Sequence, residues 1–254
     1  MAFVFNFPDV GEGIHEGRVV EWLVAEGATV AEDEPLLKVE TQLTETLHAH
    51  RPIGRAAARG RAAELLGRVR IPNPEQCLGA YPHELSGGMR QRVVIAMALA
   101  NGPDLVIADE ATTALDVTVQ AEILALLDRL CTEQGAALIF ISHDLGVVAQ
   151  LCRRVLVMYA GRAVEEADLD RLLSQPAHPY TRGLLACAPE LGHPEKPLNP
   201  IPGRPPSLNA LPEGCHFAPR CPEVRPACSR GELPLRHFDR DRLVRFIRAE
   251  ELLP

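Results

Sequence analysis

The feature that most constrains this chain is a Ser-Gly-Gly triplet. It is followed by an apolar helix and then by a short apolar strand that ends in two acidic residues. Leu85–Arg92 reads Leu-Ser-Gly-Gly-Met-Arg-Gln-Arg, and Leu105–Glu110 reads Leu-Val-Ile-Ala-Asp-Glu. Ser86 is a preferred helix N-cap, and the two glycines let backbone N–H groups approach an anion closely. The predicted helix runs to about Ala100. Its exposed N–H groups and positive dipole end make its start a phosphate site.

Helices and apolar runs alternate after this point. Apolar residues recur at helical spacing over Val117–Glu133, and Gly135 can end that helix. Apolar runs predict three buried strands, at Asp104–Ala108, Ala137–Ile141 and Arg154–Tyr159. The alternation predicts an α/β fold with a parallel sheet, whose ligand chemistry lies at the C-terminal ends of the strands.

Chemically active side chains follow two of these strands. Asp109 and Glu110 follow the first, and His143 follows the second. Two carboxylates in this place suit a metal-bound water and a base that polarises a nucleophilic water. A lone histidine is by itself more often a satisfied core or cap residue.

Four motifs in order carry a family resemblance. They resemble the signature, Walker B, D-loop and switch-histidine motifs of ABC transporter ATPases, and they lie at Leu85–Arg92, Leu105–Glu110, Thr112–Asp116 and Ile139–Asp144. Tyr81–Arg92 and Val155–Arg162 look like the ATP-binding subunits of bacterial oligopeptide, dipeptide and nickel importers. The resemblance implies an α/β P-loop NTPase domain over residues 42–188 and the C-terminal extension of those subunits over 189–254.

The resemblance also implies a role for each motif residue. Glu110 would orient or deprotonate the attacking water, His143 would contact the γ-phosphate, and Asp109 would hold Mg²⁺ through water. Asp116 would couple two protomers, and ATP held by a partner would be capped by Ser86, Gly87, Gly88 and Gln91. The implied partners are permease subunits and a second ATP-binding subunit, with the chain on the inner face of the plasma membrane.

The P-loop of that family has no counterpart in this sequence. The motif Gly-x-x-x-x-Gly-Lys-Ser/Thr holds the β and γ phosphates, but the only two lysines, Lys38 and Lys196, follow no glycine-rich turn. We therefore expect a truncated ATPase domain that alone neither binds ATP tightly nor hydrolyses it. One alternative is a non-hydrolysing partner that lends its signature to an intact ATPase.

Residues 1–41 resemble a different family. Phe3–Ile14 begins with β-forming residues and ends in a glycine-bounded turn, and three more short strands are predicted at Gly17–Val24, Gly27–Val30 and Pro35–Val39. The words Phe7–Gly13 and Gly27–Val30 resemble the first half of a lipoyl domain from a 2-oxo-acid dehydrogenase acyltransferase. Gln42–Thr44 stands where that family carries its lipoyl lysine, and Lys38 is most simply a solvated strand residue. We expect a fusion of this half domain with the ATPase, and a lipoyl carrier is a further alternative.

The remaining elements are predicted from periodicity and proline. Ala56–Val69 has helical spacing, and Ile71–Pro74 ends that helix because proline lacks a donor and restricts its predecessor. Further helices are predicted at Leu169–Leu173 and Tyr180–Ala188. Proline recurs through Pro189–Pro212, which predicts an extended segment along a surface.

Seven cysteines without an export signal favour free thiols or metal ligands over disulfides. Cys215, Cys221 and Cys228 resemble three ligands of the family's iron–sulfur site, a 4Fe-4S cluster, but Phe246 occupies the place of the fourth. A cluster would need another ligand, such as His216 or solvent. Free or transiently paired cysteines are the alternative.

Charge and hydropathy exclude several classes. The net charge of -8 argues against a nucleic-acid footprint, which would be basic. No apolar run approaches the roughly 20 residues needed to span a bilayer. Met1–Phe7 lacks a charged start and a long apolar middle, so we expect a cytoplasmic chain.

Overall fold

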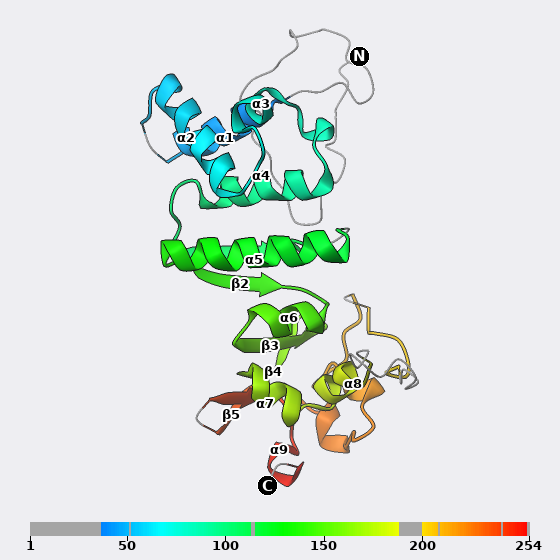
Figure 1. Ribbon diagram of the computed structural model, residues 1–254. Helices are drawn as coiled ribbons and strands as arrows, with labels where there is room; N and C mark the ends of the chain where they lie inside the picture. The colour runs from blue at the N-terminus through cyan, green and yellow to red at the C-terminus, as the bar shows by residue number, and fades with distance from the viewer. Residues whose placement is uncertain are drawn as a thin grey trace, which may run out of the picture. The chain divides into compact units, whose positions relative to one another are not determined.

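The computed structural model describes residues 37–50, 52–112, 115–187, 200–207, 209–239 and 241–252. The chain divides into two compact units, Met1–Ile141 and Ser142–Pro254 (Figure 1). The strands predicted between Phe3 and Val30 lie outside the described residues. Within these ranges no helix is both long and apolar enough to cross a membrane.

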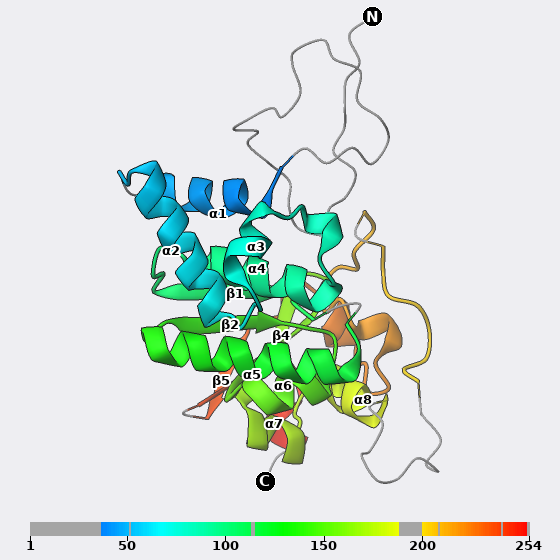
Figure 2. The ribbon, with the colours of Figure 1, turned by 45° about the horizontal axis from the view of Figure 1, so that its top comes forward.

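Helices dominate the first unit. Three of them form a group beside α4 (Figure 2), and these are α1 (Val39–His48), α2 (Arg55–Arg68) and α3 (Pro74–Gly79). The α2 helix confirms the prediction for Ala56–Val69. Buried leucines of α2 and α3 pack with the inner face of α1 and with α4 in one core.

The start of α1 corrects one prediction. Val39 was expected to end a strand, yet it begins a helix, with Glu40 and Thr41 in its first turn. The reason is that Val39, Leu43 and Leu47 recur every four residues and are all buried, so helical packing outweighs the β-propensity of valine. Lys38 precedes the helix with extended backbone and an exposed side chain, and its Nζ lies 5.6 Å from the centroid of a tyrosine ring.

A helix–strand–helix–strand run completes the first unit, with α4 (Gly87–Leu99), β1 (Leu105–Asp109), α5 (Val117–Gln134) and β2 (Ala137–Ile141). The two strands pair in parallel, from Leu105 opposite Ala137 to Asp109 opposite Ile141. Figure 1 shows α5 running along β2. Gly135 ends α5 at a φ of 69°, as its position predicted.

The expectation that β1 and β2 are fully buried is wrong. Val106 and Ala108 are buried on one face of the pair, but Leu105 and Ile107 are 45% and 62% exposed on the other. In the described residues this sheet has two strands, and the core that contains α4 and α5 covers one face of it. The apolar sequences of β1 and β2 therefore give the sheet two apolar faces, and the helical core covers only one of them.

The second unit holds an antiparallel sheet in the order β3-β4-β6-β5, with strands β3 (Arg154–Tyr159), β4 (Arg162–Asp168), β5 (Arg236–Asp239) and β6 (Arg242–Val244). The predicted strand at Arg154–Tyr159 is present, but the expectation that it joins a parallel sheet is wrong. Ala160 and Gly161 have φ values of 45° and 78° and form a two-residue turn, which sends β4 back along β3.

Helices and turns surround this sheet, namely α6 (Leu145–Leu151), α7 (Leu169–Ser174), α8 (Pro179–Cys187), η2 (Ala218–Arg220), η3 (Pro226–Ser229) and α9 (Ala249–Leu252). The two helices predicted near Leu169 and Tyr180 are thus confirmed. Residues 200–207 contain no helix or strand. The Arg220 guanidinium donates to the carbonyls of Ile201 and Pro202, both at 2.9 Å, and so fastens part of the predicted extended segment.

Candidate functional site

The start of α4 presents the first candidate site. Ser86 is its N-cap, and the Ser86 hydroxyl accepts a hydrogen bond from the Met89 N–H at 3.3 Å. The N–H groups of Gly87 and Gly88 belong to the first turn, where helix N–H groups have no intrahelical acceptor. Gln91 lies one turn further on, half-buried. The structure therefore brings the four signature residues together at one helix terminus.

The two glycines also serve the packing of α4 against α5, which sequence reasoning missed. A Cβ placed on Gly88 would lie 2.8 Å from Cγ1 of Val119, closer than real Cβ contacts come. A Cβ on Gly87 would lie 3.4 Å from Cδ2 of Leu115. Gly88 is therefore required for the close approach of two helices, whether or not a phosphate binds above it.

Arg92, next to these residues, is held within the protein. Its guanidinium donates to the Val69 carbonyl at 3.0 Å and to Oε2 of Glu122 at 2.8 Å. These bonds connect the C-terminal end of α2, α4 and α5. Arg92 is thus engaged in joining helices of the first unit.

The C-terminal end of β1 presents the second candidate site. Asp109 ends the strand and is exposed, and Glu110 follows it, also exposed. The Glu110 N–H donates to the Ile141 carbonyl at 3.0 Å, and Glu110 has a φ of 46°. Positive φ is costly for a residue with a side chain and often marks functional positions. Carboxylate oxygens are the ligands that Mg²⁺ prefers, so the donor chemistry of this edge fits that ion.

Asp116 has a structural role in the first unit. It is the N-cap of α5, and its Oδ1 accepts a hydrogen bond from the Val119 N–H at 2.9 Å. The cap fixes the start of the helix that packs against Gly88. This observation accounts for an aspartate here without a second protomer.

His143 lies in the second unit, exposed, between two residues that shape the start of α6. The Ser142 hydroxyl accepts from the Asp144 N–H at 3.0 Å, and Asp144 Oδ1 accepts from the Gly146 N–H at 2.8 Å. The structure thus brings Asp109 and Glu110 together at one strand end, and places His143 in the other unit. The neighbours that favoured a switch histidine also form an ordinary helix cap.

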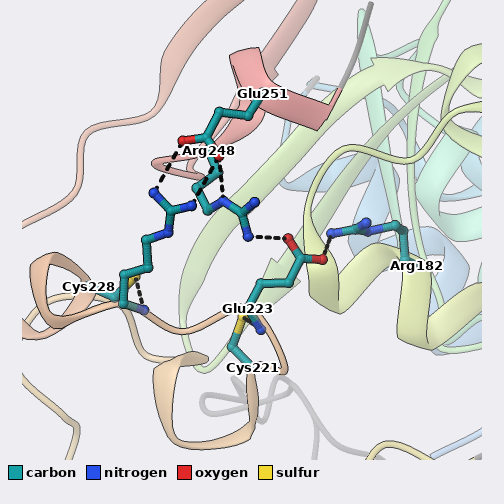
Figure 3. A network of polar contacts seen from close by, with 7 residues as sticks. Arg182, Cys221, Glu223, Cys228, Arg248 and Glu251 are labelled. Carbon is teal, nitrogen blue, oxygen red and sulfur yellow. Dashed lines mark hydrogen bonds and ion pairs between the residues drawn. The ribbon is translucent and has the colours of Figure 1, made fainter.

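The three C-terminal cysteines lie on turns of the second unit, and Figure 3 shows two of them, Cys221 and Cys228. The Cys215 N–H donates to the Cys228 carbonyl at 2.8 Å, while Cys221 Sγ and Cys228 Sγ accept N–H bonds at 3.4 Å from Glu223 and Arg225. Burial raises the pKa of the Cys215 and Cys221 thiols, which favours the protonated form over the metal-binding thiolate. All seven cysteines are free in the structure.

The described residues do not fit a metal cluster. In them, no three of His, Cys, Asp and Glu gather so that they could hold an ion. His216, the substitute ligand that the sequence offered, has its Nδ1 at 2.9 Å from the Ala160 carbonyl. Phe246 packs against His178, with ring centroids 5.8 Å apart.

A chain of ion pairs around these turns escaped the sequence analysis. Figure 3 shows Glu223 between Arg182 of α8 and Arg248, and Glu251 of α9 next to Arg248. Glu251 also pairs with Arg225. The Arg248 Nε lies 2.8 Å from Glu251 Oε2. Arg248 and Glu251 lie three residues apart, but the partners in the other pairs are at least 25 residues apart in sequence, so no local pattern indicates those pairings. The chain of pairs ties α8 and α9 to the cysteine-bearing turns.

A buried ion pair also escaped it. Glu165 of β4 and Arg242 of β6 are both buried, with Arg242 Nη2 2.6 Å from Glu165 Oε1. Glu165 further accepts from the Ala177 and His178 N–H groups at 2.9 and 2.8 Å. Burial, aided by Arg182 and Arg245, lowers the pKa of His178 to about 3, so this histidine is neutral.

Two family models match this chain. The model for the ABC transporter matches residues 13–113, and the model for the oligopeptide/dipeptide transporter, C-terminal region, matches residues 164–228. The first match begins within the segment 1–41 that resembles half a lipoyl domain. The second covers β4, α7, α8 and the cysteine-bearing turns.

Two known relatives are similar to most of this chain. The oligopeptide transport ATP-binding protein AppD of Bacillus subtilis is 46% identical over 217 residues, which are 85% of this chain and 66% of that protein. OppD of Salmonella typhimurium, with the same descriptive name, is 48% identical over 220 residues, 86% of this chain and 65% of that protein. The chain thus spans about two thirds of the length of these relatives.

A solved structure supports the fold. The chain is similar to an ABC transporter described as of the metal-chelate type, in an inward-facing conformation, with a TM-score of 0.50 and 22% identity over 62% of this chain and 60% of that one. This likeness confirms the α/β fold of an ABC ATPase. The chain thus has the fold of an ABC ATPase, and its matched models and relatives make it similar to the ATP-binding subunits of oligopeptide and dipeptide ABC importers.

Proposed function

We propose that this chain is an energy-coupling component of a peptide or nickel importer, and that its signature caps ATP held by the P-loop of another polypeptide. One observation carries the proposal. The start of α4 presents the Gly87 and Gly88 N–H groups at a positive helix end, while the sequence contains no Gly-x-x-x-x-Gly-Lys-Ser/Thr. The names of AppD and OppD, oligopeptide transport ATP-binding proteins, support the solute class.

The other motif residues take the roles that the family implies. Asp109 holds Mg²⁺ through water and Glu110 orients or deprotonates the attacking water, which the exposed carboxylates at the end of β1 support. His143 contacts the γ-phosphate and Asp116 couples the protomers. Bound Mg²⁺ and ATP would supply charge neutralisation and the transferable phosphoryl group. Without a P-loop these residues address phosphates that another polypeptide must hold.

The proposed partners follow from the same reasoning. A second ATP-binding subunit supplies the P-loop, and permease subunits place the complex at the inner face of the plasma membrane. The domain limits 1–41, 42–188 and 189–254 are part of the proposal.

A mixing experiment tests the capping role. The chain is combined with an intact import ATPase whose own signature has been inactivated, and ATP turnover is measured. We expect no turnover and no micromolar ATP binding by the chain alone, and turnover in the mixture. Micromolar binding by the lone chain, or a mixture as inactive as its parts, contradicts the proposal.

A charge variant separates phosphate capping from folding. Gly87→Asp places a carboxylate at the start of α4, where it suits the helix dipole but repels a triphosphate. Gly54→Asp makes the same change at the exposed N-cap of α2, where a Cβ meets nothing within 4 Å. We expect the Gly87 variant to abolish turnover of the mixture and the Gly54 variant to preserve it.

Two further hypotheses are proposals, a lipoyl-domain fusion and an iron–sulfur site. The resemblance of residues 1–41 to half a lipoyl domain supports a fusion. If a lipoate ligase fails to add mass to the chain, the lipoyl-carrier hypothesis is rejected. The iron–sulfur site that the resemblance implies at Cys215, Cys221 and Cys228 rests on the sequence alone, because no three possible ligands gather in the described residues. Anaerobic reconstitution that leaves neither iron nor visible thiolate–iron absorption rejects the cluster.

A further inference from the structure

The turns that bear Cys215, Cys221 and Cys228 lack a complete set of metal ligands. A cluster of the kind that the resemblance implies takes four thiolates, and Phe246 stands at the place of the fourth. The three cysteines and His216 are all among the described residues, and no three of these side chains gather so that they could hold an ion. The donor set therefore does not fit the cluster.

Phe217, which lies between Cys215 and Cys221 in sequence, anchors these turns in an aromatic group. Phe217 is 2% exposed, and its ring centroid lies 5.2 Å from that of Tyr159 and 5.4 Å from that of Tyr180. Both contacts are edge-to-face, an arrangement that stabilises ring pairs beyond the effect of burial. The cysteine-bearing turns thus supply their own aromatic anchor.

The ring of His178 connects this anchor with Phe246. His178 is buried, and its ring centroid lies 5.9 Å from that of Phe217 and 5.8 Å from that of Phe246. Phe246 lies just after β6, which pairs with β4. The contact therefore links the cysteine-bearing turns to the end of a strand in the sheet. The three side chains His178, Phe217 and Phe246 are called the aromatic clasp below.

Polar contacts hold the same turns. The Cys215 N–H donates to the Cys228 carbonyl at 2.8 Å, and Nη1 of Arg162 donates to the Gly214 carbonyl at 3.2 Å. A Cβ on Gly214 would collide with the Cys228 carbonyl oxygen, so the close approach of the two backbone segments requires glycine here. Glu223 adds the ion pairs with α8 and Arg248 that Figure 3 shows.

We infer that the aromatic clasp holds the cysteine-bearing turns without a metal, and that Phe246 does by packing what a fourth thiolate would do by ligation. In a structural metal site, the ion supplies the free energy that brings the ligand-bearing turns together. Here, ring contacts, hydrogen bonds and ion pairs already connect the turns to β6 and α8. The turns should therefore keep their structure whether or not iron is supplied. The iron–sulfur hypothesis drawn from the sequence predicts the opposite.

Iron supply and removal test this difference. The full chain is reconstituted anaerobically with iron and sulfide, and iron content is measured beside hydrogen exchange of the Cys215 and Cys228 amides, both of which donate to backbone carbonyls. We expect bound iron far below stoichiometric, and exchange that neither reconstitution nor a chelator changes. Iron bound in stoichiometric amounts, or a chelator that speeds exchange of these amides, overturns the metal-free clasp.

Two variants separate packing from ligation. Phe246→Ala removes the ring that contacts His178, and exchange of the Cys215 and Cys228 amides should become about tenfold faster or more. Cys221→Ser removes a thiolate but keeps an acceptor for the Glu223 N–H, so exchange should change by less than about threefold. If a metal held the turns, Cys221→Ser would be the more disruptive of the two, and that order overturns the clasp.

Phe238→Ala is the matched control. Phe238 of β5 packs against the same small core as Phe246, and its truncation should leave exchange at the Cys215 and Cys228 amides unchanged. Equal acceleration by Phe238→Ala and Phe246→Ala contradicts a specific role for Phe246. If Phe246→Ala does not fold, Phe246→Leu replaces it, with the same order of effects expected. ATP turnover enters none of these measurements, so the clasp and the capping role of the signature can fail independently.

Discussion

Gly88 of the signature contributes to helix packing, beside the chemical role that is proposed for it. Gly88 lies where α4 approaches α5, and the added Cβ distance of 2.8 Å to Val119 leaves no room for a side chain. Asp116 caps the partner helix in the same contact. Loss of function at either position is therefore ambiguous unless stability is measured beside it.

Gly88→Ala should destabilise the first unit. Overpacking of this kind costs about 1–3 kcal/mol of unfolding free energy. The double variant Gly88→Ala/Val119→Ala should recover part of the lost unfolding free energy, because it removes the Cγ1 methyl group that the new Cβ would meet. Gly87→Ala, with an added Cβ at 3.4 Å, should cost less. Urea unfolding of the four proteins measures this, and equal stability of Gly88→Ala and the unchanged chain would refute the packing duty.

Asp116→Ala should also destabilise the first unit, because the Val119 N–H loses its acceptor. The expected loss is about 1 kcal/mol, typical of an N-cap aspartate. Asp116→Asn keeps a cap and removes the charge, so it should stay near the unchanged chain in urea unfolding. If Ala and Asn lower stability equally, the charge and not the cap matters.

The buried histidine makes stability depend on pH. His178 Nδ1 accepts from the Tyr180 N–H at 3.1 Å, and its pKa falls from 6.5 to about 3. Between pH 6.5 and 3, His178 binds a proton in the unfolded chain but stays neutral in the folded chain. The contribution of His178 to stability is therefore full above pH 6.5 and declines as pH falls toward 3. The slope approaches about 1.4 kcal/mol per pH unit within that window.

His178→Gln should flatten this decline relative to the unchanged chain. The measurement is the unfolding free energy of both proteins at several pH values from 7 down to the acid limit of folding. Parallel curves for the two proteins would show that His178 does not carry the dependence.

At the scale of elements, β4 and β6 are joined through a buried charge pair. Arg242→Met leaves the carboxylate of Glu165 buried with two backbone donors only, and such broken pairs cost about 3–5 kcal/mol. Adding Glu165→Gln should recover part of the loss, since the uncharged side chain is cheaper to bury. Arg61→Met breaks an exposed pair with Glu64 and should change nothing measurable in thermal unfolding. An Arg242→Met protein as stable as Arg61→Met would contradict this account.

The elements that the sequence predicted are those with local signals. Ser86 and Gly135 mark helix ends by their own chemistry, and Ala137–Ile141 is a strand because its apolar run is short and bounded. The antiparallel strand β4 was not predicted, although the Ala160–Gly161 pair before it is a two-residue turn signal. Val39 was misassigned because a β-branched residue can also occupy the inner face of a helix.

The candidate site was predictable only in part, for a physical reason. The signature and the Asp109–Glu110 pair each lie within a few consecutive residues, so a local pattern identifies them. The pairing of Glu165 with Arg242 spans 77 residues, and the ion pairs of Figure 3 span up to 41. Such pairings depend on how the chain returns on itself, which no local pattern encodes. The same holds for the contact between Gly88 and Val119.

At the scale of the whole molecule, the hydrophobic cores follow the division at Ile141. One core uses buried residues between Val39 and Cys131, and the others use buried residues between Val157 and Ala249. Gly88 and Val119 belong to the elements of the first set, and Glu165 and Arg242 to the second. A local loss of packing should therefore open the unit in which it lies.

Hydrogen exchange of two variants checks this independence. Gly88→Ala should speed exchange over residues 39–141 and leave β3, β4 and β6 as protected as in the unchanged chain. Arg242→Met should do the reverse. Each protein is the control for the other, because both are destabilised while the site of the change differs. If either variant speeds exchange evenly through both units, the chain unfolds as one cooperative body and its stability is a single quantity. If the effects stay apart, the first unit can be open while the second remains folded.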